Sequence, residues 1–412
     1  MRSNLADLYS WELNTKMLPT VWQALAQSKT LTKLTVKFPS KRNPRPIALV
    51  PPMPNLRYVK FHDIDPLCYS DDISIFFLGS KNLHHVSLHF SPRMRQMREP
   101  SIHYSNFFGK CDAANYLLPL KSIAVQNLYD PNSRSCGEIV DHRMIEEITF
   151  LNSTGGIGDD NSAVFGDNDW KNPNQCVMPT LKMLRLDKVS HAQCDFLGTI
   201  TGLERLYLIG PHAKPSSSTE NSTNPIPNTY PRSPASSISS PGSTDPCSIL
   251  ALKDLYLENI TTAHGATLRH LLLPPQWRLS NDDIARIIRQ CPNLEQLAIG
   301  FEYDQFRHMR LLVPFLSKLT ALRLLGNPDD PAFVNKMREL DRQGLHEEKI
   351  GEETVNREWS RMRWIEMGDG DMLFEIGKRY QTEGGQWRRE VKRRSREDVQ
   401  GLEVWELDCL DI

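Results

Sequence analysis

The residues of this chain that could do chemistry are cysteines, histidines and paired aspartates, and their spacing limits what that chemistry can be. The sequence contains no Cys-x-x-Cys pair, so it indicates neither a zinc ribbon nor a thioredoxin-type redox site. We therefore expect reduced, buried thiols and no cofactor. The eight cysteines are Cys68, Cys111, Cys136, Cys176, Cys194, Cys247, Cys291 and Cys409.

Four histidines lie close together near the start of the chain, at His62, His84, His85 and His89. Residues four apart on a strand are separated by about 13 Å. His85 and His89 are therefore too far apart to share one metal ion, whose ligands lie at about 2.0–2.1 Å. We expect no metal site, and we interpret the cluster as part of a binding surface with a weak pH dependence.

Sequence motifs of catalysis are absent. Gly-x-Ser-x-Gly, His-Glu-x-x-His and the kinase signatures do not occur. The glycine-rich stretch 155–158 lacks the Lys-Ser/Thr of a phosphate-binding loop, and the aspartate pairs 71–72 and 282–283 stand where helices are expected to begin, which favours capping over acid–base chemistry. We expect no enzyme, and a hydrolase with a site in the loops is the least favoured alternative.

The charge balance and hydropathy exclude further classes of partner. The 412 residues hold 49 Lys and Arg against 50 Asp and Glu, a formal net charge of −1, whereas nucleic-acid binding needs a clear basic excess. No stretch approaches the roughly 18 apolar residues of a membrane span, and the first residues lack the features of a secretory signal. We expect a monomer in the cytoplasm or nucleus that binds no nucleic acid and no membrane.

A repeated pattern, Leu-x-x-Leu-x-Leu, organises the chain. Neighbouring copies begin 25 residues apart (31 to 56), 27 apart (56 to 83) and 25 apart (294 to 319), within the 20–29 residues of a leucine-rich repeat. Apolar positions two apart suit a strand with one buried face. The pattern predicts an α/β leucine-rich-repeat solenoid, a horseshoe with a parallel sheet on its concave face and helices and loops on its convex face. The copies begin at Leu31, Leu56, Leu83, Leu120, Ile145, Leu181, Leu203, Leu252, Leu294, Leu319 and Met362.

The repeats divide the chain into an N-terminal helical cap (1–30), the solenoid (31–361) and a C-terminal capping segment (362–412). Within the solenoid, the Ser- and Pro-rich stretch 211–247 is expected to be disordered and 155–175 to form a flexible loop. In the cap, 372–376 should form a strand and the basic run 388–396 a solvated strand or hairpin, or else a nuclear-localisation signal. Apolar Val404, Trp405 and Leu407 should cover the last repeat. Candidate phosphorylation sites are Ser233, Ser240 and Ser395.

Several phrases of the sequence resemble a known family. Residues 291–297, Cys-Pro-Asn-Leu-Glu-Gln-Leu, resemble a phrase of the repeats in F-box proteins, and 51–57, 91–95 and the ending 403–412 look like the F-box/leucine-rich-repeat proteins of filamentous fungi. The resemblance covers nearly the whole chain from about Leu18. It implies a substrate receptor of an SCF ubiquitin ligase, whose F-box docks on the adaptor of the cullin scaffold while the repeats hold the target.

The F-box itself is not recognisable. Leu18-Pro19 resembles the opening of an F-box, but only 12 residues separate Pro19 from the first repeat at Leu31, too few for three helices. We interpret residues 21–26 as an outer helix before the first strand. Two alternatives stay open: a receptor that has lost its F-box, or an F-box encoded upstream of Met1.

The binding surface is expected on the concave face, where stacking aligns the outward residues of successive strands in columns about 4.8 Å apart. Tyr and Arg dominate binding energy, so adjacent Tyr207 and Tyr256 should bind a protein; an aromatic ladder that only stabilises the sheet is the alternative. Arg205 should form a cross-strand ion pair with Asp254. The candidate partner-binding residues are Lys60, His62, His85, His89, Arg185, Arg205, Tyr207, Asp254, Tyr256, Glu258 and Arg323.

Together these features predict a protein-binding solenoid related to SCF receptors in ubiquitin-ligase substrate selection. The alternative is a scaffold or regulator that uses the same concave face in a pathway unrelated to ubiquitin.

Overall fold

A computed structural model describes most of the chain. The described residues are 7–13, 15–39, 50–91, 105–128, 136–151, 177–209, 246–300, 315–326, 335, 339, 345–355, 361–368, 372–409 and 412.

A single sheet of fourteen strands extends along the described chain, with the strands in sequence order from β1 to β14. Pairing is parallel from β1 to β12 and antiparallel from β12 through β14, and the sheet is not closed into a barrel. The strands are β1 Leu8–Trp11, β2 Lys33–Lys37, β3 Tyr58–Ile64, β4 His85–Phe90, β5 Ser122–Gln126, β6 Glu147–Leu151, β7 Met183–Leu186, β8 Arg205–Leu208, β9 His270–Leu272, β10 Gln296–Gly300, β11 Ala321–Leu325, β12 Trp364–Met367, β13 Met372–Gln381 and β14 Trp387–Arg394.

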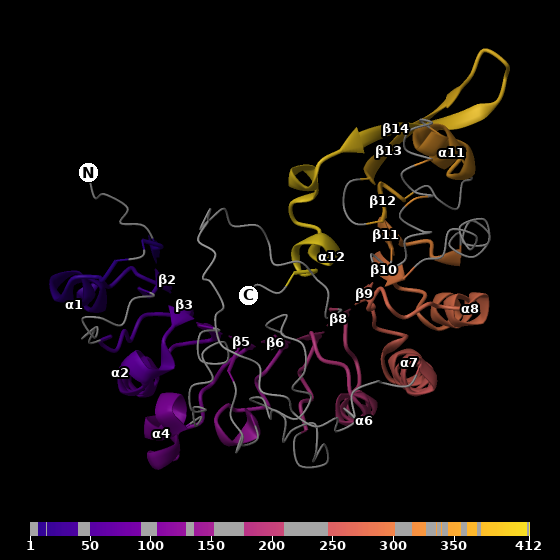
Figure 1. Ribbon diagram of the computed structural model, residues 1–412. Helices are drawn as coiled ribbons and strands as arrows, with labels where there is room; N and C mark the ends of the chain where they lie inside the picture. Colours follow the sequence, from indigo (N-terminus) through magenta and orange to yellow (C-terminus); the bar gives the residue numbers. More distant parts are fainter. Residues whose placement is uncertain are drawn as a thin grey trace, which may run out of the picture.

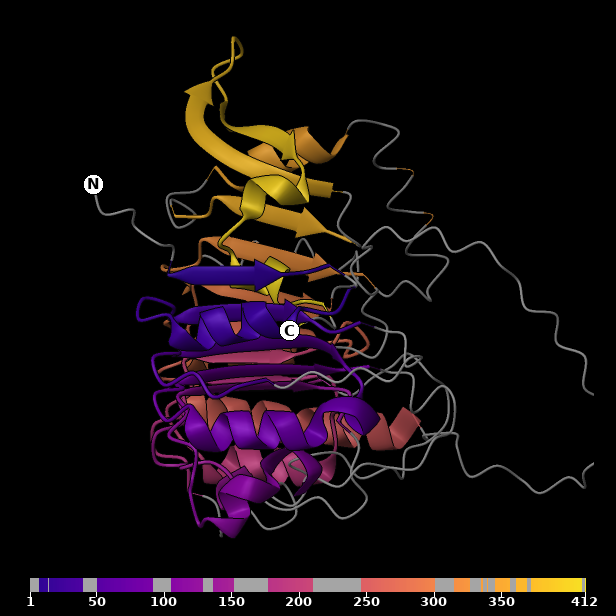
Figure 2. The ribbon, with the colours of Figure 1, turned by 90° about the vertical axis from the view of Figure 1, so that its left-hand side faces the viewer.

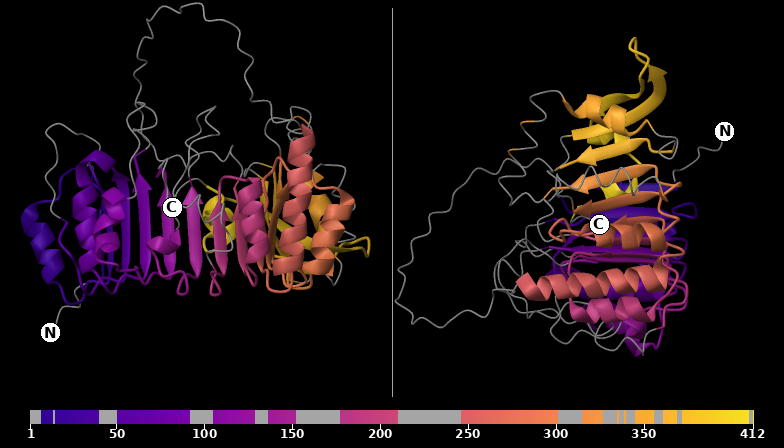
Figure 3. Two further views of the ribbon diagram at one scale, coloured as in Figure 1. Left: turned by 90° about the horizontal axis from the view of Figure 1, so that it is seen from below. Right: turned by 90° about the vertical axis from the view of Figure 1, so that its right-hand side faces the viewer.

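The sheet curves into an arc, with most of the helices on its outer side and α12 on its inner side (Figure 1). Viewed from one side, the strands lie above one another like rungs (Figure 2), and several outer helices lie next to one another along the arc (Figure 3). The α-helices are α1 Pro19–Gln27, α2 Pro66–Gly79, α4 Ser105–Ala113, α6 His191–Thr199, α7 Pro246–Asn259, α8 Asn281–Gln290, α11 Leu345–Glu353 and α12 Glu403–Glu406. No helix among the described residues is long and apolar enough to cross a membrane.

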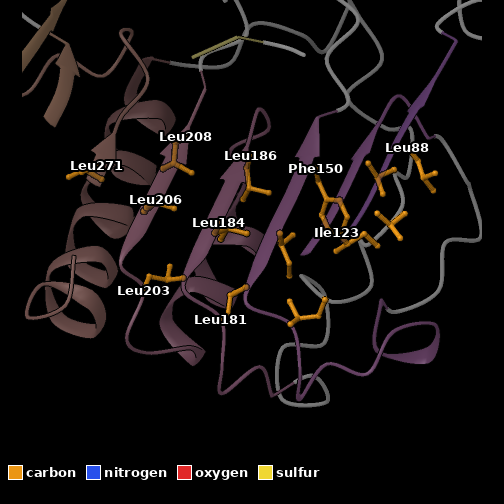
Figure 4. Close-up of a cluster of buried hydrophobic side chains, with 14 of the residues drawn as sticks. Leu88, Ile123, Phe150, Leu181, Leu184, Leu186, Leu203, Leu206, Leu208 and Leu271 are labelled. Atoms are coloured by element: carbon orange, nitrogen blue, oxygen red, sulfur yellow. The ribbon is translucent and has the colours of Figure 1, made fainter. Parts of the chain in front are cut away.

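The main core lies between the sheet and the outer helices, and the repeat pattern builds it. Leu184 and Leu186 of β7, for example, are buried, as are Leu206 and Leu208 of β8, and Figure 4 shows these side chains on neighbouring strands. Each repeat buries little apolar surface alone, so its stability comes from the neighbours on both sides. Among the eleven predicted copies, ten correspond to strands in this sheet.

The copy predicted at Leu252 is wrong. Residues 246–259 form helix α7, which continues into a π-helical turn at Ile260–His264. A strand would bury Leu255 together with Leu257, but Leu255 is 45% exposed while Tyr256, Leu257 and Ile260 are buried, a helical period. The strand instead is β9. Leu271 within it and Leu268 and Leu273 on either side repeat the same spacing and are buried.

Of the two aspartate pairs predicted to begin helices, only the pair 282–283 lies at the start of one. Before α8, the Ser280 hydroxyl accepts from the Asp283 N–H at 3.2 Å while Asp283 accepts from the Ser280 N–H at 2.9 Å, a capping box. Helix α2, however, begins at Pro66, with the Asp65 carboxylate accepting from the Leu67 N–H at 3.1 Å. The capping role predicted for Asp71 and Asp72 is therefore wrong, because both lie inside the helix.

The predicted ends of the chain are confirmed in part. Helix α1 precedes β2, as the N-terminal pattern predicts, but β1 before it was not foreseen. Strands β13 and β14 form the predicted hairpin at the basic run. Residues 155–175 and 211–245, with Ser233 and Ser240, lie outside the described residues, whereas residues 246 and 247 begin α7.

The predicted buried thiols include Cys111, Cys194 and Cys291. Burial raises the pKa values of these three thiols to about 11, 11 and 12.

Candidate functional site

The inner face of the sheet, opposite the outer helices, carries the predicted columns of side chains. Strand register aligns one central column across the parallel strands, as the repeat predicts, except that Leu272 stands where Tyr256 was expected. The column contains Thr35, Lys60, Ser87, Ala124, Thr149, Arg185, Tyr207, Leu272, Ala298, Arg323 and Glu366.

Three predicted site residues do not belong to this face. Tyr256, Asp254 and Glu258 lie on helix α7, so Tyr256 cannot stack beside Tyr207. The Tyr256 hydroxyl instead donates to the Ser190 carbonyl at 3.0 Å. The predicted Arg205–Asp254 ion pair is also wrong, since Asp254 is exposed and lies 3.5 Å from Lys253.

The C-terminal segment, residues 402–409, covers the inner face of the later strands. Val404 and Trp405 are buried in a second, smaller core together with Tyr207, Leu272 and Ala298 of the sheet. Figure 1 shows α12, which belongs to this segment, inside the arc near β8 to β10. Val404, Trp405 and Leu407 were predicted to cover the last repeat. Trp405 does contact it, through Glu366 on β12, but the segment also lies across the inner face of several earlier strands.

Glu403 is the centre of one polar cluster under the segment. It accepts from Arg205 Nη1 at 2.9 Å and from the Tyr207 hydroxyl at 2.5 Å, and His270 Nδ1 lies 3.1 Å away. Burial alone would raise the pKa of Glu403, but the bonds to His270 and Tyr207 and the charge of Arg205 lower it to about 2. Glu403 is therefore ionised at neutral pH and bonded to residues of β8 and β9.

Arg323 is the centre of a second cluster, in which Arg323 and Glu366 are fully buried. Its Nε donates to Glu366 at 2.8 Å, its Nη1 lies 2.8 Å from Asp408, and Nη1 also donates to the Val404 carbonyl. The Trp405 indole N–H donates to the same Glu366 carboxylate, and the Arg323 guanidinium lies 5.5 Å from the Trp405 ring centroid. Burial lowers the pKa of Arg323, but the charges of Glu366 and Asp408 raise it by more than burial lowers it. The arginine therefore stays charged.

Arg185 joins the segment at its other end. Its Nε donates to the Leu407 carbonyl at 3.0 Å and its Nη2 to the Cys409 carbonyl at 2.7 Å. Further along, Ile412 packs against Leu151 and Ile209. Arg185, Arg205, Tyr207 and Arg323 were predicted to face a partner protein, and in this structure they bind the chain's own C-terminal segment.

The N-terminal part of the inner face, on β2 to β4, lies outside the contacts of this segment. Lys33, Tyr58 and His85 form one column and Thr35 and Lys60 belong to the next, all exposed or partly exposed. His62 and His89 lie side by side with their ring centroids 6.0 Å apart. Four of the predicted site residues, Lys60, His62, His85 and His89, are thus brought together here.

His62 does not make the surface respond to pH near neutrality, as was predicted for the histidine cluster. Burial, with the charges of Lys60 and His89, lowers the pKa of His62 to about 4. Burial also lowers the pKa of His85. The His89 imidazole accepts from the Asp63 N–H at 3.3 Å. His62 is therefore neutral between pH 6 and pH 8, and the positive charge on these strands comes from Lys33, Lys37 and Lys60.

Several residues of the face were not singled out from the sequence. Glu403 and Glu366 hold the covered part together, and Lys33 and Tyr58 extend the N-terminal part. The column rule alone identifies Lys33, Tyr58 and Glu366, because each alternates with the buried positions of its strand. No pattern in the sequence shows that Glu403 returns to β8 and β9.

Comparison with known proteins adds no family to this picture. Neither the protein-family models nor the curated proteins with which the chain was compared match it.

Proposed function

We propose that the chain is a leucine-rich-repeat solenoid that binds a protein partner through the N-terminal part of its inner face. The observation that carries the proposal is the succession of Lys, Tyr and His side chains on β2, β3 and β4, partly exposed and in register. On the later strands the equivalent positions are already occupied by the C-terminal segment. Within the described part of the chain, residues 402–409 do not cover this surface. Polar and aromatic side chains arranged in columns on a curved sheet suit a protein ligand.

The partner surface that fits best is acidic. Lys33, Lys37 and Lys60 lie on two adjacent strands. One carboxylate beside them, Asp63, already lies 3.5 Å from Lys37 and 3.5 Å from His89. A partner that brings carboxylates to this surface would gain charge-assisted hydrogen bonds from the lysines. Its association would weaken as salt concentration rises.

The test is a comparison of two full-length double variants with the same change of charge. Lys33→Glu with Lys60→Glu reverses two charges on the inner face, and Arg286→Glu with Arg289→Glu reverses two exposed charges on the outer helix α8. Quantitative affinity purification should recover one or more proteins with the wild type and the α8 variant but at least 10-fold less with the inner-face variant. Equal recovery with all three chains would contradict the proposal.

The more specific role, a substrate receptor of an SCF ubiquitin ligase, is supported by the sequence phrase at 291–297 and not by the geometry of the N-terminus. The described residues before β2 contain one helix, α1 of nine residues. Binding of the purified SCF adaptor to the full chain would support this role. Lack of binding would overturn the direct receptor role and leave the protein-binding function standing.

A further inference from the structure

The contacts of the C-terminal segment resemble those of a bound peptide on a receptor. Two arginines of the sheet, Arg205 and Arg323, each bind one carboxylate of the sheet and one of the segment. Arg205 lies 2.6 Å from Glu147 and 2.9 Å from Glu403. Arg323 lies 2.8 Å from Glu366 and 2.8 Å from Asp408.

Because each arginine also pairs with a carboxylate of the sheet, its charge is neutralised even without the segment. If the segment leaves, Glu147 still holds Arg205 and Glu366 still holds Arg323, so neither arginine is left as an uncompensated charge. Both guanidinium groups then keep their positions while their remaining N–H groups face the vacated surface. A surface whose donors are fixed in advance pays less conformational entropy when it binds a ligand.

The segment offers three anchors in a short sequence. Glu403 occupies the Arg205–Tyr207–His270 cluster, Trp405 donates its indole N–H to Glu366, and Asp408 reaches Arg323. A buried tryptophan between charged hydrogen bonds is the composition typical of binding hot spots. The anchors define the spacing Glu-x-Trp-x-x-Asp.

The connection to the sheet permits the segment to move as a unit. β14 ends at Arg394, and after the short turn Arg396–Val399 the chain passes through Gly401 at φ 88°. Apart from its chain neighbours, no described atom lies within 4 Å of the place where a Cβ would stand, and the Gly401 N–H donates to Glu406 of the segment at 2.6 Å. Glycine adopts this left-handed conformation without strain and is free to adopt others. Rotation at this residue changes the direction of everything that follows it.

We propose that the inner face of β7 to β12 is a peptide-binding site for an acidic segment of the form Glu-x-Trp-x-x-Asp, and that this chain fills the site with its own residues 402–409. A partner protein that carries such a segment binds by displacing them. The proposal is independent of the function assigned to β2 to β4, since it concerns other strands and another ligand.

The binding test uses the full chain with Glu403→Gln and Trp405→Ala, which weaken the internal contact while leaving Arg205, Arg323 and Glu366 in place. The probe is a synthetic peptide of residues 401–412, measured by isothermal titration calorimetry. We expect the peptide to bind the variant at least 10-fold more tightly than the wild type, and a peptide with Trp405→Ala to bind the variant at least 10-fold more weakly. A folded variant that binds neither peptide, or binds both equally, would overturn the proposal.

A second measurement needs no variant. In the wild type, the Val404 N–H donates to the side-chain oxygen of Gln296 on β10 at 3.2 Å, so its hydrogen exchange reports undocking of the segment. We expect it to exchange at least 10-fold faster than the Leu273 N–H, which donates to the Ala298 carbonyl at 2.9 Å. If both amides exchange at the same rate, in one common unfolding event, the segment is a permanent part of the core. That result would overturn the proposal.

Discussion

The two parts of the inner face share one strand register but differ in what lies on them. His85 and His270 stand in the same column, on β4 and β9, and Lys60 and Arg323 share the central column, on β3 and β11. On the later strands Arg323 is buried and the His270 side chain, 13% exposed, lies against Glu403, whereas Lys60 and His85 on β3 and β4 are partly exposed and lie outside the contacts of residues 402–409. The repeat thus decides which side chains reach the inner face, whereas a distant segment decides which of them meet solvent.

The charge chemistry of the two parts differs accordingly. Under the segment, arginines are paired with carboxylates in low-dielectric surroundings, where each bond is strong and each loss is costly. On β2 to β4, lysines lie near water, where ion pairs contribute little to stability. Substitutions should therefore affect folding in the covered part and binding in the N-terminal part.

The largest effect should come from Arg323→Ala. The change removes the nearest cation from Glu366, whose side chain is 0% exposed, and leaves it only the more distant Arg396, at 3.8 Å, and the Trp405 indole N–H. We expect a loss of about 4 kcal/mol in the free energy of unfolding. Urea unfolding followed by circular dichroism measures it. Arg363→Ala is the matched control, because Arg363 pairs with Glu375 at 3.1 Å but is 65% exposed, and its loss should stay below about 1 kcal/mol. Equal losses would remove the distinction between the covered part and the surface.

Trp405→Ala should follow, with a loss of about 3 kcal/mol, because the indole is buried and its removal leaves a cavity. The control is Trp387→Ala on β14, whose side chain is 53% exposed and whose removal should cost less than about 1 kcal/mol. Thermal unfolding of both variants gives the comparison. A Trp405 variant as stable as the wild type would mean that the segment contributes nothing to the fold.

Glu403→Gln should show a smaller effect that depends on pH. The pKa of Glu403 is about 2 in the folded chain against an ordinary 4.5, so its ionised form stabilises the fold fully above pH 4.5, and that contribution is lost as pH falls towards 2. We expect the free energy of unfolding of the wild type to exceed that of the variant by about 2 kcal/mol at pH 7 and by about 1 kcal/mol at pH 3.5. A difference independent of pH would contradict the ionic role of Glu403.

His62→Gln should show the smallest effect, and in a different pH window. The folded pKa of His62 is about 4 against 6.5, so the unfolded chain binds the proton first and the wild type loses stability as pH falls from 6.5 to 4. The glutamine variant lacks this loss and should gain about 1 kcal/mol relative to the wild type between pH 7 and pH 5. Unfolding midpoints at the two pH values measure it. Parallel pH profiles would show that His62 is solvated like an ordinary histidine.

The sequence predicts the sheet better than it predicts the site. Alternation of apolar residues places Lys60, Arg185, Tyr207 and Arg323 on the inner face, because register follows from the buried positions. The same spacing at Leu252 misleads, since Leu-x-x-Leu-x-Leu also satisfies a helical period when Tyr256 and Ile260 follow. Periodicity is a local signal.

The cover over the later strands has no such signal. The contact between Glu403 and Arg205 spans 198 residues, and the contact between Arg323 and Val404 spans 81. Nothing in the local pattern of residues 402–409 states which strands they will cross. The sequence shows that the segment is acidic and contains an aromatic residue. Which strands it contacts follows only from the folded sheet, where the columns lie side by side.

Two histidines form a matched pair across the inner face, and their chemical modification compares its open and covered parts most directly. His85 and His270 occupy the same column, but the His270 side chain is 13% exposed and lies against Glu403. Diethylpyrocarbonate at pH 7, with peptide mass spectrometry, should modify His85 at least 10-fold faster than His270, and Trp405→Ala should bring the two rates closer. Equal rates in the wild type would contradict the division of the inner face into an open and a covered part.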